Sequence, residues 1–247
     1  MDVDRLFEHP IAHRGLHDLE AGIIENSRTA VLRAIEHGYA IEIDVQVTAE
    51  GDAVVFHDDD LDRLTEQNGP VRKRPLQGLI GIPLSGSTAG DTIWPIEELL
   101  KHVGGAVPLV IEMKSHWDGD LRLARRMANL LAAYEGPVCA ESFDPTLVRE
   151  FGGLAPGVPR GIIGYSYPAG EEGNLSAFRR FILRHLLHWP VTRPHFISWS
   201  VQDLEMASVR IARRMRVPVS AWTVRTPGDQ ARAGLFADQM VFEGFLP

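Results

Sequence analysis

Acidic residues occur in two segments of the chain that are rich in Val and Ile. Within each segment they lie two residues from another charged residue, which in a strand places both side chains on the same face. Glu42 and Asp44 lie two apart in the run Ala40–Thr48, and residues two apart in a strand face the same side. Carboxylates that share an interior face are costly unless a cation neutralises them, and Mg²⁺ and Ca²⁺ prefer oxygen ligands. Taken alone, the pair fits a metal site and a salt-bridged strand end about equally well.

The run Pro108–Lys114 repeats this spacing with Glu112 and Lys114. Alone, these two residues are more typical of a structural ion pair than of a functional site. If their strand lies near Glu42 and Asp44, Glu112 supplies a third carboxylate, and Lys114 is suited to hold a phosphate beside it. The three acids together favour a site for one divalent metal ion, Mg²⁺ or Ca²⁺.

Two histidines stand at the ends of predicted strands. His13 is followed by Arg14, and His57 closes the run that begins at Ala53. A lone histidine at a strand end is more often structural than catalytic, but imidazole can both accept and donate a proton near neutral pH. The guanidinium of Arg14 matches the oxygens of a phosphate. Together with the carboxylates, these residues favour the cleavage of a phosphodiester.

Short apolar runs alternate with helical patterns along the chain, which is typical of parallel sheets built from βα units. The predicted strands are Ile11–Arg14, Ala40–Thr48, Ala53–His57, Pro108–Lys114, Val138–Phe143, Gly161–Tyr165, Phe196–Val201, Val217–Val224 and Gln239–Phe245. The second and third runs are interpreted as a hairpin that continues one barrel strand, so eight barrel strands result. We therefore predict a TIM (β/α)₈ barrel, which the length of 247 residues suits.

Helical patterns fill most of the intervals between these strands. The predicted helices are Ser27–His37, Ile96–Val103, Leu121–Tyr134, Pro145–Phe151, Leu175–Leu187, Leu204–Arg214 and Pro227–Ala233. No helical pattern follows the last strand, so we expect the eighth outer helix to be missing and Val3–Glu8 to cover that gap or the barrel floor. Residues 58–95 are rich in Gly, Pro and charge and are predicted to form an insertion at the barrel mouth. We find no linker and predict a single domain over residues 1–247.

The composition limits the classes of function that the chain can have. Hydrophobic residues make up 45% of the chain and the net charge is −8, so no broad basic face for nucleic acid is expected. Cys139 is the only cysteine, which excludes an intrachain disulfide and favours a reducing compartment. Because the sequence shows neither a signal peptide nor an apolar run long enough for a membrane span, we predict a cytoplasmic location. The sequence does not indicate an oligomeric state.

The segment Phe178–Trp189 combines apolar residues at helical spacing with three arginines. Such a segment can rest on an anionic membrane surface. It can also be an outer barrel helix, and we favour this second interpretation. The residues that would then pack against the barrel are Phe178, Phe181, Ile182 and Leu186.

Three residues near predicted strand ends need a separate decision. His17 follows His13 by four residues, but Gly15 interrupts any helix between them, so His17 is predicted to be a loop residue and not a metal ligand. Trp199 fits the core and the pocket rim about equally well. Trp222 is also near a strand end and can line the pocket.

Several of these residues belong to short motifs that resemble those of the glycerophosphodiester phosphodiesterase family, part of the phosphatidylinositol-specific phospholipase C-like phosphodiesterase superfamily. The matching motifs are His13-Arg14-Gly15, Glu25-Asn26-Ser27, Glu42-Ile43-Asp44-Val45, His57-Asp58 with Leu61-Asp62-Arg63, Leu109–Lys114, Ser142-Phe143 and Trp222-Thr223-Val224. Their order and spacing match, and they are spread over almost the whole chain. The first half carries the most specific ones.

The resemblance implies a role for each matching residue. Glu42, Asp44 and Glu112 would bind the divalent metal, and His13 and His57 would be the acid–base pair. Arg14 and Lys114 would hold the phosphate, and Glu25 would sit beside the metal or a substrate hydroxyl. The match also places Trp222 at the substrate pocket. The family also implies the fold predicted above, a small-molecule glycerophosphodiester as substrate, and glycerol 3-phosphate and an alcohol as products.

Three positions depart from the family pattern. Ile24 replaces a usual Pro, Arg225 replaces a usual Asn, and Glu243 replaces a usual Asp. These changes concern the rim of the site, so they bear on the alcohol that leaves more than on the reaction. A lysophospholipase D that uses the same residues is one alternative. A non-catalytic protein that binds a phosphate ligand is the other.

Overall fold

The chain folds into helices that alternate with short strands, and the computed structural model describes residues 3–170 and 175–247. The strands are β1 Ile11–Ala12, β2 Ala40–Val47, β3 Ala53–Val55, β4 Trp94–Pro95, β5 Leu109–Met113, β6 Val138–Ser142, β7 Arg160–Gly164, β8 Phe196–Ser200, β9 Val219–Val224 and β10 Gln239–Phe242. The α-helices are α1 Arg28–Glu36, α2 Ile96–Val103, α3 Arg122–Ala132, α4 Pro145–Leu154, α5 Ala177–Arg184, α6 Trp189–Thr192, α7 Ala207–Arg214 and α8 Pro227–Phe236.

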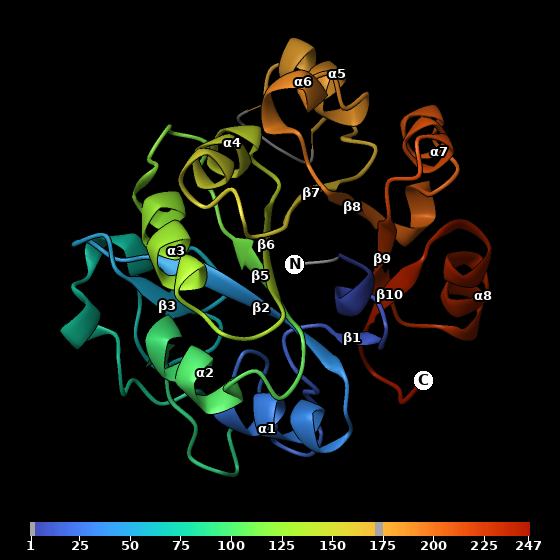
Figure 1. Cartoon of the computed structure of the whole chain (residues 1–247). Coiled ribbons are helices and arrows are strands. Elements are labelled where there is room, and N and C mark those ends of the chain that lie inside the picture. The colour runs from blue at the N-terminus through green and yellow to red at the C-terminus, as the bar shows by residue number, and fades with distance from the viewer. Residues whose placement is uncertain (1–2, 171–174) are drawn as a thin grey trace.

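The strands close into a barrel. The order of parallel strands is β1-β10-β9-β8-β7-β6-β5-β2, and β1 also pairs with β2, so the ring is complete. Figure 1 looks into this ring and shows the helices around its outside. The predicted (β/α)₈ barrel is confirmed, and most strand ends lie within one or two residues of the prediction.

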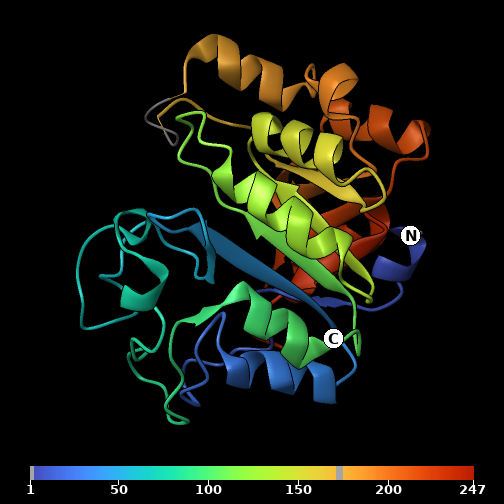
Figure 2. The ribbon, with the colours of Figure 1, turned by 60° about the vertical axis from the view of Figure 1, so that its left-hand side comes forward.

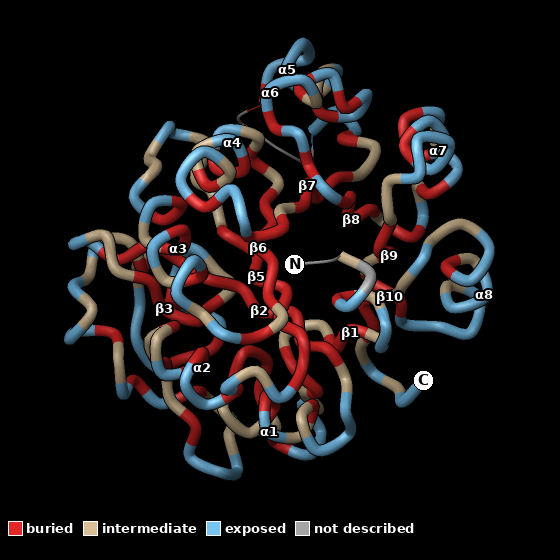
Figure 3. Tube along the Cα trace, viewed as in Figure 1, coloured by how far each residue is buried: buried red, intermediate tan, exposed pale blue. Residues whose placement is uncertain are grey.

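The alternation of side chains in β2 separates the core from the site. Ile41, Ile43 and Val45 are fully buried in the main apolar cluster, which lies between the strands and the helices. Glu42 and Asp44 therefore point to the inside of the barrel, as predicted. Figure 3 shows the strands buried along their length and the outer sides of the helices exposed.

The hairpin predicted after β2 is present, and the insertion that follows it has a small core of its own. β3 pairs antiparallel with the carboxyl end of β2, and β4 pairs with β3. Within residues 58–95, two short 3₁₀ helices, η2 Val71–Lys73 and η3 Leu76–Gly78, pack on an apolar cluster. Figure 2 shows this segment projecting at one end of the barrel. β4 was not predicted, because two residues are too short to give a pattern.

The opposite end of the barrel is covered by the N-terminal segment. The 3₁₀ helix η1, Val3–Leu6, lies over the centre of the ring in Figure 1. Leu6 is fully buried against inward-facing residues such as Val110 and Phe196, and the ring of Phe7 packs edge-on against that of Phe196 with centroids 5.6 Å apart. Of the two places predicted for this segment, it therefore takes the barrel floor. The described residues after β10 form no further helix.

The packing predicted for the outer helix α5 is confirmed for Leu186, which lies in the main core just after the helix, and is wrong for two other residues. Phe178 and Phe181 are 72% and 52% exposed, so neither packs against the barrel. Ser176 caps the helix by accepting a hydrogen bond from the backbone N–H of Arg179. Within α5, Leu183 is the buried residue, and it packs in a small apolar cluster with Tyr167 and Leu175. Because the segment has apolar residues on more than one side, its spacing alone did not determine which side is buried.

No helix among the described residues has the length and apolar character needed to cross a membrane.

Candidate active site

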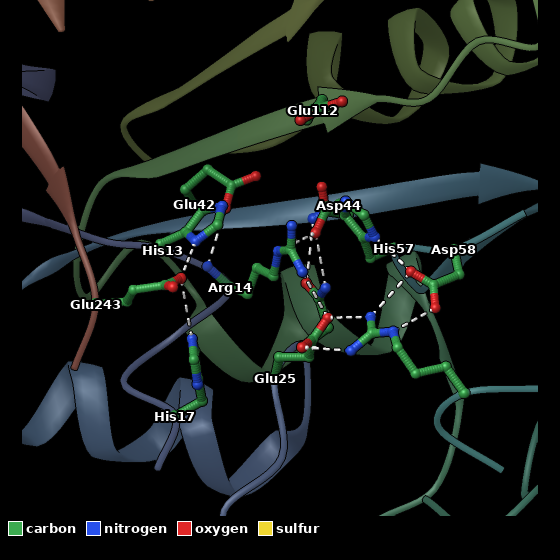
Figure 4. Close-up of polar contacts among 12 residues, drawn as sticks. His13, Arg14, His17, Glu25, Glu42, Asp44, His57, Asp58, Glu112 and Glu243 are labelled. Carbon is green, nitrogen blue, oxygen red and sulfur yellow. Dashed lines mark hydrogen bonds and ion pairs between the residues drawn. The ribbon is translucent and has the colours of Figure 1, made fainter. Parts of the chain in front are cut away.

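Three carboxylates converge inside the barrel. Glu42 and Asp44 extend from β2, and Glu112 extends from the neighbouring β5, where it stands beside Asp44 in the register of the two strands. The three residues are 3%, 1% and 9% exposed. One oxygen from each lies within 4.8 Å of the others. The geometric condition for a shared cation is thus met, and Figure 4 shows the three side chains facing the same space.

Two cations already lie among these acids. The Nζ atom of Lys114 is 2.7 Å from Asp44 Oδ1 and 2.7 Å from Glu112 Oε1, and Arg14 Nε is 3.3 Å from Asp44 Oδ2. Burial alone would raise the pKa of Asp44, but the positive charges of Lys114, His57 and Arg14 lower it overall. Burial together with the charges of Asp44 and Glu112 raises the pKa of Glu42 well above its usual value. The positive charges of Lys114 and Arg14 therefore stabilise the ionised form of Asp44 more than that of Glu42.

The donor set fits a hard divalent cation. All three side chains offer oxygen, the donor that Mg²⁺ and Ca²⁺ prefer. Glu42 Oε1 is buried and has no hydrogen-bond partner, and such an atom is costly unless it binds something. Glu42, Asp44 and Glu112 are therefore the residues that could hold the metal.

His13 has one ring nitrogen tied to a carboxylate. His13 Nδ1 donates a hydrogen bond to Glu243 at the end of β10, and His13 Nε2 lies 3.9 Å from Glu42 Oε2. Burial lowers the pKa of His13 below its usual value, while the hydrogen bond to Glu243 acts in the opposite direction. Glu243 is held in turn by Arg225, whose Nε is 2.6 Å from Glu243 Oε1.

His17 also lies beside this carboxylate, with Nε2 3.5 Å from Glu243 Oε2. His13, His17 and Glu243 have ligand atoms close enough to hold a metal, which the spacing of the histidines did not predict. Both oxygens of Glu243 are already engaged, by His13 and by Arg225. We therefore interpret this group as a support for the His13 ring.

His57 is held in the same way as His13. Its Nδ1 donates a hydrogen bond to Asp58 Oδ1 at 2.6 Å. The guanidinium of Arg63 donates two further hydrogen bonds to Asp58, at 2.6 and 2.9 Å. Burial would raise the pKa of Asp58, but the hydrogen bonds from His57 and Arg63 lower it. Each imidazole thus has Nδ1 fixed on a carboxylate, so Nε2 is the nitrogen left for proton transfer.

The loop after β1 positions Arg14 and Asp44. The backbone N–H of Arg14 donates to Glu42 Oε2 at 2.9 Å, and its guanidinium donates to Glu25 at 2.7 Å. Glu25 also accepts hydrogen bonds from Arg63, the shortest 2.7 Å long. Asn26 brackets Asp44 with two hydrogen bonds, one to its carboxylate and one from its backbone N–H. Glu25 therefore bridges Arg14, which follows His13 in the chain, and Arg63, which binds the carboxylate beside His57.

A cavity of about 420 Å³ opens over these groups. The predicted site residues that line it are His13, Arg14, Glu42, His57, Glu112, Lys114 and Trp222. Asp44 and Glu25 are not among its lining residues. Trp222 packs edge-on against Phe143, which also lines the cavity, with ring centroids 5.5 Å apart. Trp199, by contrast, is fully buried in the main core.

The sequence interpretation missed a fourth acid at the cavity. Glu141 is 2% exposed, lies beside Glu112 in the register of β5 and β6, and lines the cavity. Its Oε2 is buried without a partner. Burial and the nearby charge of Glu112 raise its pKa well above the usual value. The alternation of Cys139 and Glu141 in the predicted strand could have revealed it.

Comparison with known proteins gives a consistent result. The model of the Glycerophosphoryl diester phosphodiesterase family matches residues 13–242. A curated relative from Caldanaerobacter subterraneus subsp. tengcongensis, named Glycerophosphodiester phosphodiesterase, is 32% identical over 161 residues. That match covers 62% of this chain and 65%, just under two thirds, of the relative.

Solved structures share the fold. A phosphodiesterase from Oleispira antarctica, in complex with the product sn-glycerol-3-phosphate, has a TM-score of 0.77 at 20% identity and covers 94% of this chain and 91% of its own. A glycerophosphodiester phosphodiesterase from Thermotoga maritima has a TM-score of 0.70 at 23% identity and covers 95% and 94%. At these identities the likeness concerns the barrel alone.

Proposed function

Because the chain belongs to the glycerophosphoryl diester phosphodiesterase family, and is thus a phosphoric diester hydrolase, we propose that it converts glycerophosphodiesters to glycerol 3-phosphate and an alcohol by metal-dependent, paired-histidine catalysis. One observation carries the finer part of this proposal. The same cavity is lined by two carboxylate-bound imidazoles and by acids of a three-carboxylate cluster. The glycerol phosphate in the complex of the Oleispira antarctica protein supports the choice of substrate.

Glu42, Asp44 and Glu112 would hold one divalent ion, Mg²⁺ or Ca²⁺. When bound, such an ion supplies positive charge and Lewis acidity at the phosphate. Lys114 contacts two of its ligands and faces the cavity, so it would contribute to phosphate binding. Arg14 lines the same cavity and adds donors on the other side of Asp44. These fixed charges would stabilise negative charge that grows on the phosphate oxygens.

The two histidines would account for the protons of the reaction. Hydrolysis adds one water to the diester and breaks the bond between phosphorus and the oxygen of the leaving alcohol. One imidazole would take a proton from the attacking water as its oxygen bonds to phosphorus, and the other would give a proton to the leaving oxygen. Glu243 and Asp58 would orient the rings, because each fixes an Nδ1.

Trp222 and the insertion of residues 58–95 would shape access to the cavity. An apolar cluster of Tyr167, Leu175 and Leu183 extends to Phe143 beside the cavity. This cluster favours one second candidate, a lysophospholipase D that uses the same residues on a lipid-bearing diester. The cytoplasmic location stays a prediction and fits the buried free thiol of Cys139.

The test is to measure release of glycerol 3-phosphate from a panel of glycerophosphodiesters by the purified chain. We expect turnover to disappear after EDTA treatment and to return with Mg²⁺, Ca²⁺ or Mn²⁺. His13→Ala and His57→Ala should each lower the rate by roughly 10²–10⁴. Glu135→Ala removes an exposed acid three residues beyond the end of α3 and serves as the control.

Three outcomes would contradict the proposal. Undiminished turnover in Glu42→Ala and Asp44→Ala would remove the metal role. Thermal stabilisation by glycerol phosphate without turnover of any diester in the panel would instead support a binding protein. Activity confined to micellar lysophospholipids would favour the lysophospholipase D.

A further inference from the structure

The segment from α5 to α6 exposes an unusual number of large apolar side chains. Phe178, Phe181, Leu187 and Val191 are 72%, 52%, 55% and 59% exposed. They lie within 14 consecutive residues and are four of the eleven strongly exposed large apolar side chains in the described part of the chain. We call these four residues the α5–α6 face. Isolated apolar residues on a surface need no explanation, but such a concentration marks an interaction site.

The charge of the same segment is opposite to that of the whole chain. The chain has 33 acidic and 25 basic residues, yet residues 175–202 contain four arginines and no Asp or Glu. Arg179, Arg184 and Arg193 are exposed, and none of the four arginines forms an ion pair with a described carboxylate. Glu171 and Glu172 precede this segment and lie outside the described residues. Among the described residues, the apolar face is therefore accompanied by positive charge that no carboxylate pairs with.

The phase of α5 puts these two features side by side. Phe178 and Phe181 are three residues apart and share one side of the helix. His185 continues this side, because its ring packs on Phe181 with centroids 4.6 Å apart. Arg184 lies on the border of this side next to Phe181, whereas Arg179 lies nearer the inner residue Leu183, with its guanidinium over the Trp117 ring. An apolar side that is bordered by arginine is typical of helices that lie in a membrane interface.

The α5–α6 face adjoins the aromatic wall of the catalytic cavity. Leu183, on the inner side of α5, packs in a cluster that includes Trp117 and Phe143, and Phe143 lines the cavity. The guanidinium of Arg179 lies 5.3 Å from the centre of the Trp117 ring. Figure 1 shows α5 and α6 together at the periphery of the barrel, and Figure 3 shows exposed residues along them.

We propose that the α5–α6 face docks the protein on an anionic lipid surface. A second copy of the chain is the other partner that an apolar face suggests. In a twofold contact, however, the same face meets itself, so the arginines of one copy would lie against those of the other. Like charges brought together in this way oppose association. An anionic bilayer instead satisfies the apolar side chains and the arginines at once.

The experiment is a flotation assay with the full chain and vesicles of two compositions. We expect binding to phosphatidylcholine vesicles that contain phosphatidylglycerol, little binding to phosphatidylcholine alone, and weaker binding as salt is raised. Arg179→Gln/Arg184→Gln should weaken binding about fivefold per charge removed. Phe178→Ser/Phe181→Ser should weaken it about tenfold or more, because both rings lose their burial.

A matched control separates docking from a general loss of surface apolarity. Leu235→Ser removes a side chain that is 70% exposed on α8, and it should leave vesicle binding unchanged. All variants should keep the melting temperature and the turnover of soluble glycerophosphocholine, since the altered side chains are exposed and do not line the cavity. Because binding is measured without substrate, its outcome is independent of the proposed catalytic function.

Three results would overturn the inference. One is the absence of binding to anionic vesicles. Another is equal binding by the wild type and by Phe178→Ser/Phe181→Ser. The third is a dimer in light scattering that dissociates in that double variant, because a second copy would then cover the face.

Discussion

The contact between Glu243 and His13 gives the most direct test of the proposed chemistry. Glu243→Gln keeps the size of the side chain but removes its charge. In the wild type, one carboxylate oxygen accepts the hydrogen bond of His13 Nδ1 and the other accepts that of Arg225. The change therefore leaves the cavity lined by the same residues and alters the group that orients and stabilises the imidazole.

The size of the effect follows from the nature of this hydrogen bond. A hydrogen bond to a charged group contributes about 1.5–3 kcal/mol, and each 1.4 kcal/mol in a barrier changes the rate about tenfold. If the bond is strongest when His13 carries its second proton, losing it should lower kcat/KM by roughly tenfold to 150-fold. Folding should be affected much less, because Glu243 is at the rim with 18% of its side chain exposed.

The same variant should shift the pH profile in a defined direction. Burial lowers the pKa of His13, and the hydrogen bond to Glu243 partly offsets this effect. Without the carboxylate the pKa of His13 falls further, so the limb that His13 governs moves to lower pH. If His13 is the base, the acidic limb moves. If His13 is the acid, the alkaline limb moves.

The assay is kcat/KM for glycerophosphocholine between about pH 5 and 9 at saturating metal. His17→Gln is the matched control, because it removes the more distant neighbour of Glu243 and keeps the bond to His13. We expect it to change the rate less than about threefold. An unchanged rate and pH profile in Glu243→Gln would refute the view that this carboxylate supports catalysis through His13.

Three further predictions follow from the barrel interior. Glu112→Gln should raise the Mg²⁺ concentration needed for half-maximal activity by about tenfold or more, measured by titration after EDTA treatment. Glu141→Gln should increase the free energy of unfolding at neutral pH and lose this advantage near pH 4, as measured by the melting temperature at a series of pH values. Because the pKa of Glu141 is raised, the native state keeps a proton that the unfolded chain releases. The stability of the wild type therefore falls as the pH rises, whereas that of the variant does not. Gly164→Ala would bring a methyl group within 2.3 Å of the Trp199 ring and should destabilise the fold by about 1–3 kcal/mol, measured by chemical denaturation. Gly153→Ala is the control, because its added methyl group would meet open space, and it should be neutral or stabilising.

The fold was predictable wherever a local pattern carried it. β-Branched runs between Gly and Pro located the barrel strands, because a strand buried on both sides needs apolar residues throughout. The period of two then assigned Glu42 and Asp44 to the interior, as the burial of Ile41 and Ile43 confirms. The packing face of α5 was not predictable in this way, since Phe181 and Leu183 are both apolar and only the tertiary contacts of Leu183 decide between them.

The site was predictable in its residue types but not in its long-range support. Glu243 and His13 are 230 residues apart, and they meet only because β10 closes the ring against β1. No local pattern contains that information. Two of the three departures from the family motif, Arg225 and Glu243, form a hydrogen bond with each other. A substitution at either position therefore has to be considered together with the other.

The charges of the cavity link the metal to the substrate. Three buried carboxylates stand against Lys114 and Arg14, and Arg14 is shared with Glu25. A phosphodiester brings a further negative charge into this space, where the low dielectric strengthens every repulsion. The two resident cations are already bonded to acids, so they cannot fully neutralise the substrate as well. A divalent ion held by the carboxylates would remove this conflict, because it would neutralise its ligands and leave Lys114 and Arg14 free to face the phosphate. The proposed histidine pair would then act on a substrate whose charge is already balanced.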